Sequence, residues 1–171
     1  LRTYERHTEA EAVILEAVEQ GITYFDSARA YAGSEDYHGE VWRDHPDLRA
    51  GVFLASKSAS RFHADAEMDL QVTLQRMGIE TLDLWQIHDV RTFSDLRDLE
   101  SSDGALSAFV EAKEMGTVRH IGVTGHHDPD VLSHAVENWP IDAVMMPVNP
   151  VEGALSGFLD ATLPLAREQG V

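Results

Sequence analysis

The chain of 171 residues contains no cysteine. Disulfide bonds and thiolate metal sites are therefore excluded, and a reducing cell interior is compatible with this composition. No apolar run is long enough to cross a membrane, and the polar segment 1–11 lacks the apolar core of a signal peptide. These absences predict a cytoplasmic protein that has no membrane partner.

Basic residues are also scarce. The chain has 30 acidic residues against 13 lysines and arginines, a net charge of −17, and its lysines are Lys57 and Lys113. Such a surface repels phosphate backbones and anionic lipids, so a nucleic-acid partner is not expected. The acids are scattered, which indicates a solvated acidic surface. One hypothesis is a high-salt cytoplasm, where salt screens the repulsion between these acids.

Apolar segments alternate with amphipathic ones along the chain. Continuous apolar runs predict buried strands at 22–26, 52–56, 82–87, 120–123 and 143–146. Helices are predicted around 8–20, 35–44, 66–77, 106–116, 129–136 and 157–169, and in several of them apolar residues recur at helical spacing. This order is typical of an α/β fold in which helices cover a parallel sheet. With no linker or internal repeat, residues 1–171 are expected to form a single domain.

Three local patterns give more detailed expectations. Thr8 and Glu11 fit a capping box at the start of the first helix. The charged segment 89–104 is longer than most connections, which indicates a loop and favours a lid or a substrate loop. Pro164 is expected to kink or restart the last helix.

Three successive predicted strands end in titratable residues. Asp26 ends the first, Lys57 follows the second, His88 follows the third, and Tyr31 comes five residues after Asp26. Each has a structural interpretation: a loop cap, a solvated lysine, a core histidine or a packed tyrosine. Because chemistry gathers at the carboxyl ends of parallel strands, the four together predict a proton-transfer site.

Five stretches of the chain stand out together, at 16–31, 33–35, 54–57, 74–88 and 120–125. In this order they resemble the sequence motifs of the aldo-keto reductase family. The resemblance runs through nearly the whole chain and implies a (β/α)8 TIM barrel. Such a barrel needs about 250 residues. This chain is therefore expected to form an incomplete barrel that lacks the first strand and the last two βα units.

The resemblance also implies a catalytic tetrad of Asp26, Tyr31, Lys57 and His88. The family reduces aldehydes or ketones with NAD(P)H and no metal, so a small carbonyl compound is the expected partner. Tyr31 would donate a proton to the carbonyl oxygen as hydride reaches the carbon. Lys57, held by Asp26, would make the phenol a better acid, and His88 would orient the carbonyl.

The cofactor contacts implied by the resemblance are Asp26, Thr124, Gly125 and Met145. Family members often carry Ser-Asn in place of Thr124-Gly125 and Gln in place of Met145, so this chain departs from the family pattern there. NADP is favoured over NAD by the resemblance alone, because the sequence shows no glycine-rich phosphate loop. Nothing in the sequence indicates an oligomeric state.

Other interpretations stay open. The run His126-His127-Asp128 suggests a metal site, but it begins a helix and further ligands are not evident, so no metal is expected. The chain could instead be a reductase-like regulatory subunit that binds nucleotide with little or no turnover. A third interpretation is an open α/β binding domain whose strand-end residues are structural.

Overall fold

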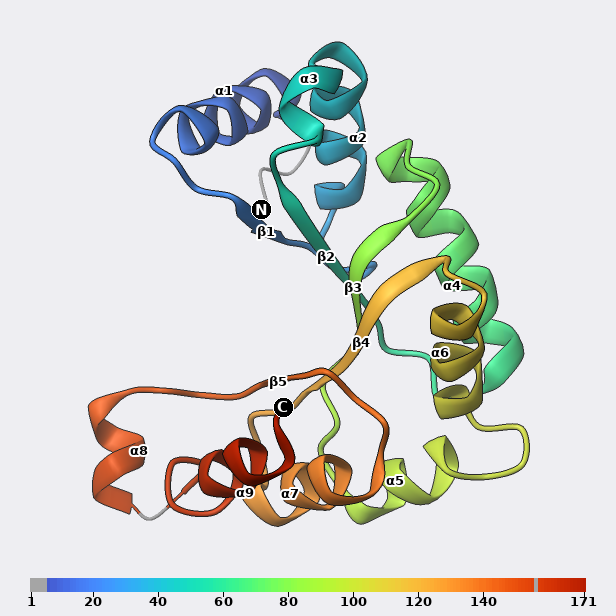
Figure 1. Ribbon diagram of the computed structural model, residues 1–171, viewed down its shortest axis with the longest axis vertical. Helices are drawn as coiled ribbons and strands as arrows, with labels where there is room; N and C mark the ends of the chain where they lie inside the picture. Colours follow the sequence, from blue (N-terminus) through green and yellow to red (C-terminus); the bar gives the residue numbers. More distant parts are fainter. Residues whose placement is uncertain (1–5, 156) are drawn as a thin grey trace.

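The computed structural model describes residues 6–155 and 157–171. Within these residues, five parallel strands form one curved sheet in the order β1-β2-β3-β4-β5, with helices on its outer side (Figure 1). The strands are β1 (Tyr24–Asp26), β2 (Phe53–Ser58), β3 (Leu82–Ile87), β4 (Val118–Thr124) and β5 (Ala143–Met145). The helices are α1 (His7–Glu19), α2 (Ser34–Asp44), α3 (Pro46–Arg49), α4 (His63–Met77), α5 (Phe93–Leu99), α6 (Ala105–Glu114), α7 (Pro129–Asn138), α8 (Pro150–Leu155) and α9 (Thr162–Gln169).

Every neighbouring pair of these strands is parallel. Asp26 lies opposite Ala55 in the β1–β2 register, and Lys57 lies opposite Gln86 in the β2–β3 register. The sheet closes only part of a circle (Figure 1). Both observations confirm the sequence prediction of an incomplete (β/α)8 barrel.

The side chains of each strand alternate between the two faces of the sheet. On β3, Trp85 and Ile87 face the helices, and Trp85 stacks on Phe109 of α6 with ring centres 3.5 Å apart. Leu84 and Gln86 point to the inner face. All six residues of β3 are buried. Burial on both faces explains why this strand reads as an apolar run rather than as an alternation.

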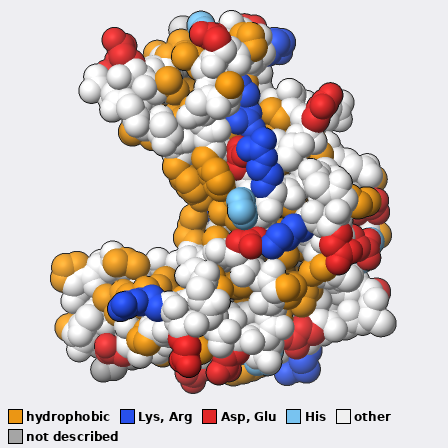
Figure 2. Space-filling view, in the orientation of Figure 1, with side chains coloured by type: hydrophobic (Ala, Val, Ile, Leu, Met, Phe, Trp, Pro, Cys, Tyr) orange, Lys and Arg blue, Asp and Glu red, His pale blue; other side chains and the backbone are white. Residues whose placement is uncertain are grey.

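The inner face of the sheet forms a hollow. Tyr24 and Phe53 stack there with ring centres 5.3 Å apart. Figure 2 shows hydrophobic side chains gathered where the molecule is hollowed. A space of about 320 Å³ in this face is lined by Tyr24, Phe53, Leu84, His120, Asp142 and Ala143. Such a layer of inward-facing side chains is typical of the interior of a (β/α)8 barrel.

The predicted capping box at Thr8 is wrong. Helix α1 begins at His7, and its N-cap residue is Arg6. The His7 ring packs edge-on against Tyr37 with centres 4.9 Å apart, and its Nδ1 lies 2.8 Å from a carboxylate oxygen of Glu40. These contacts with α2 bring His7 into the helix, so tertiary packing rather than the local capping signal sets its start.

The prediction of a loop over 89–104 is also wrong in its central part, which folds as α5. Thr92 Oγ1 accepts a hydrogen bond from the Asp95 N–H at 3.2 Å, and the Asp95 carboxylate accepts one from the Thr92 N–H at 2.9 Å. This reciprocal pair is a capping box. Leu96 and Leu99 are buried, which anchors the helix to the core.

The carboxyl-terminal region differs from its prediction in two ways. The helix expected over 157–169 begins at Thr162, so Pro164 falls in its first turn, where a missing N–H is tolerated. Helix α8 was not predicted, because its six residues are too few for a clear helical period. Among residues 6–155 and 157–171, no helix is both long and apolar enough to cross a membrane.

Candidate active site

Asp26, Lys57 and His88 lie at the carboxyl edge of three adjacent strands. Asp26 ends β1, Lys57 is the last residue but one of β2, and His88 follows β3 directly. The sequence predicted that the second of these strands ends at residue 56. In the structure β2 continues to Ser58, and the His88 N–H donates to the Ser58 carbonyl at 2.8 Å, which extends the pairing of β2 with β3. Because the strands are parallel and alternate side chains share a face, the three side chains point into the same hollow.

The Lys57 ammonium is held by two acceptors. Its Nζ donates to a carboxylate oxygen of Asp26 in a short ion pair and to the Ser27 carbonyl at 2.8 Å. The Lys57 residue is only 1% exposed. A buried ammonium is tolerated only when it is paired and hydrogen-bonded, so these contacts explain how a lysine can occupy this place.

Tyr31 and His88 complete the cluster. Lys57 Nζ lies 4.8 Å from the centre of the Tyr31 ring. The Tyr31 and His88 rings meet edge to face, with centres 5.7 Å apart and planes at 83°. The structure thus brings together all four side chains that the sequence singled out. The interpretation in which the strand-end residues are merely structural loses its support.

His88 is held in its neutral form. Partial burial lowers the pKa of His88, and the Lys57 cation lowers it further, whereas Asp89 and Asp26 act in the opposite direction. Because the net shift is downward from an ordinary value of about 6.5, the neutral imidazole is favoured at pH 7. A neutral imidazole has one N–H donor and one acceptor nitrogen, which suits it to orient a polar ligand.

A pocket of about 180 Å³ opens beside this cluster. Three of the predicted cofactor contacts, Thr124, Gly125 and Met145, lie on its wall, and Asp26 reaches it through Lys57. The full lining is Tyr31, Lys57, His88, Thr124, Gly125, His126, Met145, Met146 and Pro147.

Two features of the pocket wall are built around Thr124 and Gly125. Thr124 Oγ1 accepts the Asp89 N–H at 2.8 Å, which leaves the threonine O–H to donate elsewhere. At Gly125, an added Cβ would lie 3.0 Å from the Val90 carbonyl oxygen and 3.1 Å from Leu132 Cδ1. The missing side chain therefore lets the loops after β3 and β4 pack closely.

Sequence reasoning missed Gln86. It is buried on β3, opposite Lys57 in the strand register, and its Nε2 lies 3.5 Å from Asp26 Oδ1. A polar residue inside an apolar strand, two positions before His88, was a signal that could have been read. Gln86 gives the Asp26 carboxylate a second polar neighbour.

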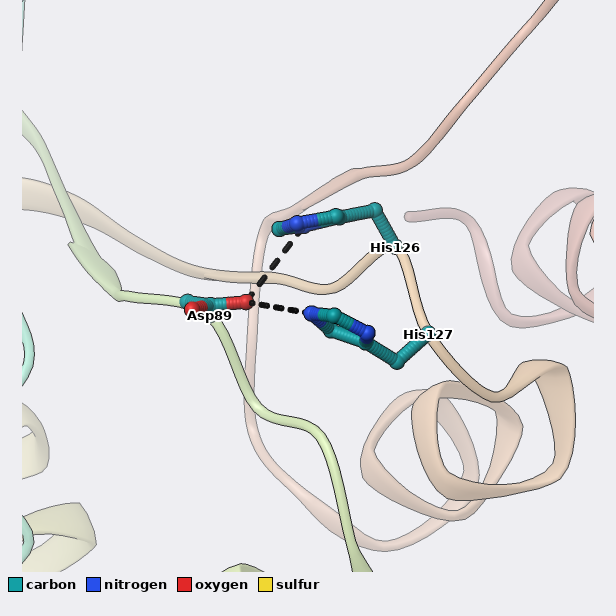
Figure 3. A group of neighbouring side chains, drawn as sticks. All are labelled: Asp89, His126 and His127. Atoms are coloured by element: carbon teal, nitrogen blue, oxygen red, sulfur yellow. Dashed lines mark ion pairs between the residues drawn. The ribbon is translucent and has the colours of Figure 1, made fainter.

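A second polar cluster is drawn in Figure 3, and one of its members, His126, lines the pocket. It joins His126 and His127, which follow β4, to Asp89, which follows β3. The sequence had suggested Asp128 as the acidic member, but Asp128 instead caps α7 by accepting the Asp130 N–H at 2.9 Å. Asp89 was missed because its closeness to the histidines arises only from the pairing of β3 with β4.

The fold agrees with what is found in known proteins. The model of the aldo/keto reductase family matches residues 3–161, and the chain belongs to this family of oxidoreductases. The aldo-keto reductase yakc [NADP(+)] of Schizosaccharomyces pombe is 28% identical over 154 residues, covering 82% of this chain and 43% of its own length. The D-galacturonate reductase of Fragaria ananassa is 33% identical over 135 residues, covering 67% of this chain and 41% of its own length.

Solved structures give the same result. An aldo-keto reductase from Bacillus halodurans, in its holo form, superposes with a TM-score of 0.78 at 25% identity, over 96% of this chain and 55% of that one. A thermostable aldo-keto reductase in complex with the inhibitor epalrestat superposes with a TM-score of 0.77 at 25% identity, over 98% of this chain and 60% of that one. The chain spans less than half the length of the two curated relatives described above.

Proposed function

We propose that this chain carries the proton-donating face of an NAD(P)H-dependent reductase that converts an aldehyde or ketone to an alcohol. The observation that carries the proposal is the position of the Lys57 ammonium, which contacts the Asp26 carboxylate and lies over the Tyr31 ring. The His88 ring meets the same tyrosine from another side. A phenol, an ammonium and a neutral imidazole at one pocket suit proton transfer to a carbonyl oxygen.

In this proposal each side chain has one role. Tyr31 donates its phenolic proton to the oxygen that gains negative charge. Lys57 stabilises the phenolate left behind, because an adjacent cation favours the charged form of a phenol. Asp26 fixes the ammonium by the ion pair, and His88 donates its imidazole N–H to the carbonyl oxygen and orients it.

The pocket wall suits a nicotinamide. Thr124 offers a free O–H, Gly125 presents bare backbone, and Met145 supplies an apolar side chain. These residues would hold the carboxamide and the ring beside Tyr31. When bound, the reduced nicotinamide supplies the hydride. NADP is favoured over NAD because a similar protein carries NADP(+) in its name.

The test is the oxidation of NADPH with a panel of aldehydes and ketones, in the natural open reading frame that contains these residues. Tyr31→Phe should lower kcat by about 10²–10⁴-fold, the usual contribution of a positioned acid. Tyr24→Phe is the matched control. Tyr24 lies on the same inner face of the sheet but lines a different space from the pocket beside Tyr31. NADPH binding, measured by fluorescence, should be unchanged in both variants.

Two outcomes would contradict the proposal. If Tyr31→Phe turned over as fast as the parent, Tyr31 would not be the acid. If the parent bound NADPH tightly and reduced no carbonyl compound, the regulatory-subunit interpretation would replace the reductase.

A further inference from the structure

Asp89, His126 and His127 form a compact set of metal-ligating side chains. One donor atom from each lies within 4.8 Å of the other two. His126 Nδ1 and His127 Nε2 each lie 3.4 Å from the same oxygen, Asp89 Oδ1 (Figure 3). The reductase mechanism proposed above gives these three side chains no role.

The distances fit coordination better than hydrogen bonding. A charged N–H···O pair closes to about 2.7–2.9 Å. Two ligands of a tetrahedral zinc ion, with bonds of about 2.1 Å, stand about 3.4 Å apart. Among the described residues, Asp89 Oδ1 is buried and has no hydrogen-bond partner. An acceptor oxygen without a donor, placed 3.4 Å from two imidazole nitrogens, matches the spacing around a cation.

The Asp89 carboxylate is also fixed in orientation. Arg91 Nε donates to Oδ2 at 2.8 Å, which leaves Oδ1 facing the histidines. The Asp89 backbone lies at φ 57°, a left-handed conformation that is uncommon outside glycine and is retained only where the surroundings enforce it. Its N–H donates to Thr124, which ties it to the loop that carries His126.

The charge of Arg91 acts on the same site. The Arg91 guanidinium repels a cation, but it contacts Oδ2 rather than Oδ1. It should weaken binding without blocking it.

From these contacts we infer that Asp89, His126 and His127 bind one divalent transition-metal ion of the zinc class. Two imidazole nitrogens and one carboxylate oxygen suit Zn²⁺, whereas Mg²⁺ and Ca²⁺ prefer oxygen ligands alone. Three protein ligands leave a fourth position for water or for an oxygen of a small molecule. His126 also lines the pocket beside Tyr31, so the ion would lie at the pocket rim.

The experiment is calorimetric titration of the protein with ZnCl₂, and with MgCl₂ for comparison. One Zn²⁺ per chain should bind with a Kd of about 1–10 μM, and Mg²⁺ should not bind. His126→Asn, His127→Asn and Asp89→Asn should each weaken Zn²⁺ binding at least about tenfold, the usual effect of perturbing a metal site. His63→Asn is the control, because His63 pairs with Glu111 on the surface away from this cluster.

Loss of binding could also follow from loss of structure, so circular dichroism must show each variant folded. A crystal soaked in zinc provides an independent measurement, with an anomalous peak expected between the three side chains. Three results would overturn the inference. They are the absence of saturable Zn²⁺ binding below about 100 μM, Zn²⁺ binding that persists in the double variant His126→Asn/His127→Asn, and a zinc peak elsewhere in the crystal. None of these measurements depends on turnover, so this inference and the proposed reductase can fail separately.

Discussion

Replacing Asp83 with alanine is expected to lower the free energy of unfolding by about 3 kcal/mol. Asp83 is 2% exposed on β3, at the end of the sheet opposite the candidate active site. Its Oδ2 accepts the Leu54 N–H at 2.9 Å and Arg49 Nη2 at 3.1 Å, and its Oδ1 pairs with Arg119. One carboxylate therefore ties β3 to β2, α3 and β4.

The magnitude follows from these partners. Leaving the Leu54 N–H without an acceptor costs about 1–3 kcal/mol, and losing the charged hydrogen bond to the partly buried Arg49 costs about 1.5–3 kcal/mol. Arg119 is 64% exposed, so its pair contributes little. Both arginines can turn toward water once the carboxylate is removed. The loss in the free energy of unfolding should therefore lie near the lower end of the sum of these two costs. Asp83→Asn retains an acceptor for Leu54 and should cost about half as much.

The assay is urea unfolding followed by circular dichroism and tryptophan fluorescence. Removing any acid from a chain of net charge −17 also relieves repulsion. Asp160→Ala, at an exposed position, therefore serves as the control with the same change in charge. If Asp83→Ala unfolded within about 0.5 kcal/mol of this control with an unchanged m-value, the reasoning from buried partners would be refuted.

Three further predictions concern the site and the surface. Lys57→Met should lower kcat for NADPH-dependent carbonyl reduction by about 10²-fold, and activity equal to the parent would contradict the role given to the ammonium. Burial lowers the pKa of His88. As pH falls, kcat/KM should therefore stay level through about 6.5 and decline only below it, where the imidazole gains a proton. A pH profile that falls already above about 6.5 would count against a neutral His88. If the acidic surface is adapted to salt, the melting temperature should rise between dilute buffer and molar KCl, and a constant or falling value would remove that hypothesis.

Much of the fold could be predicted from local patterns. The apolar run of β3 was placed at its observed bounds. The helix expected around 66–77 does end at Met77, and Gly78 follows it with a left-handed φ of 63°. The start of α1 could not be predicted, because the contact of His7 with Glu40 on α2 outweighs the capping signal. The missed helix α5 was readable, since its capping box is local. That residues 1–171 form a single domain stays a prediction.

The sequence by itself determined that strands and helices alternate, and therefore that Asp26, Lys57 and His88 share one edge of a parallel sheet. Hydrophobic periodicity is a local property, so it can be recognised from the sequence alone. Only the tertiary structure decided which polar atoms meet. The pairing of β3 with β4 sets Asp89 against His126, far along the chain, and such contacts depend on register and side-chain direction that no local pattern records.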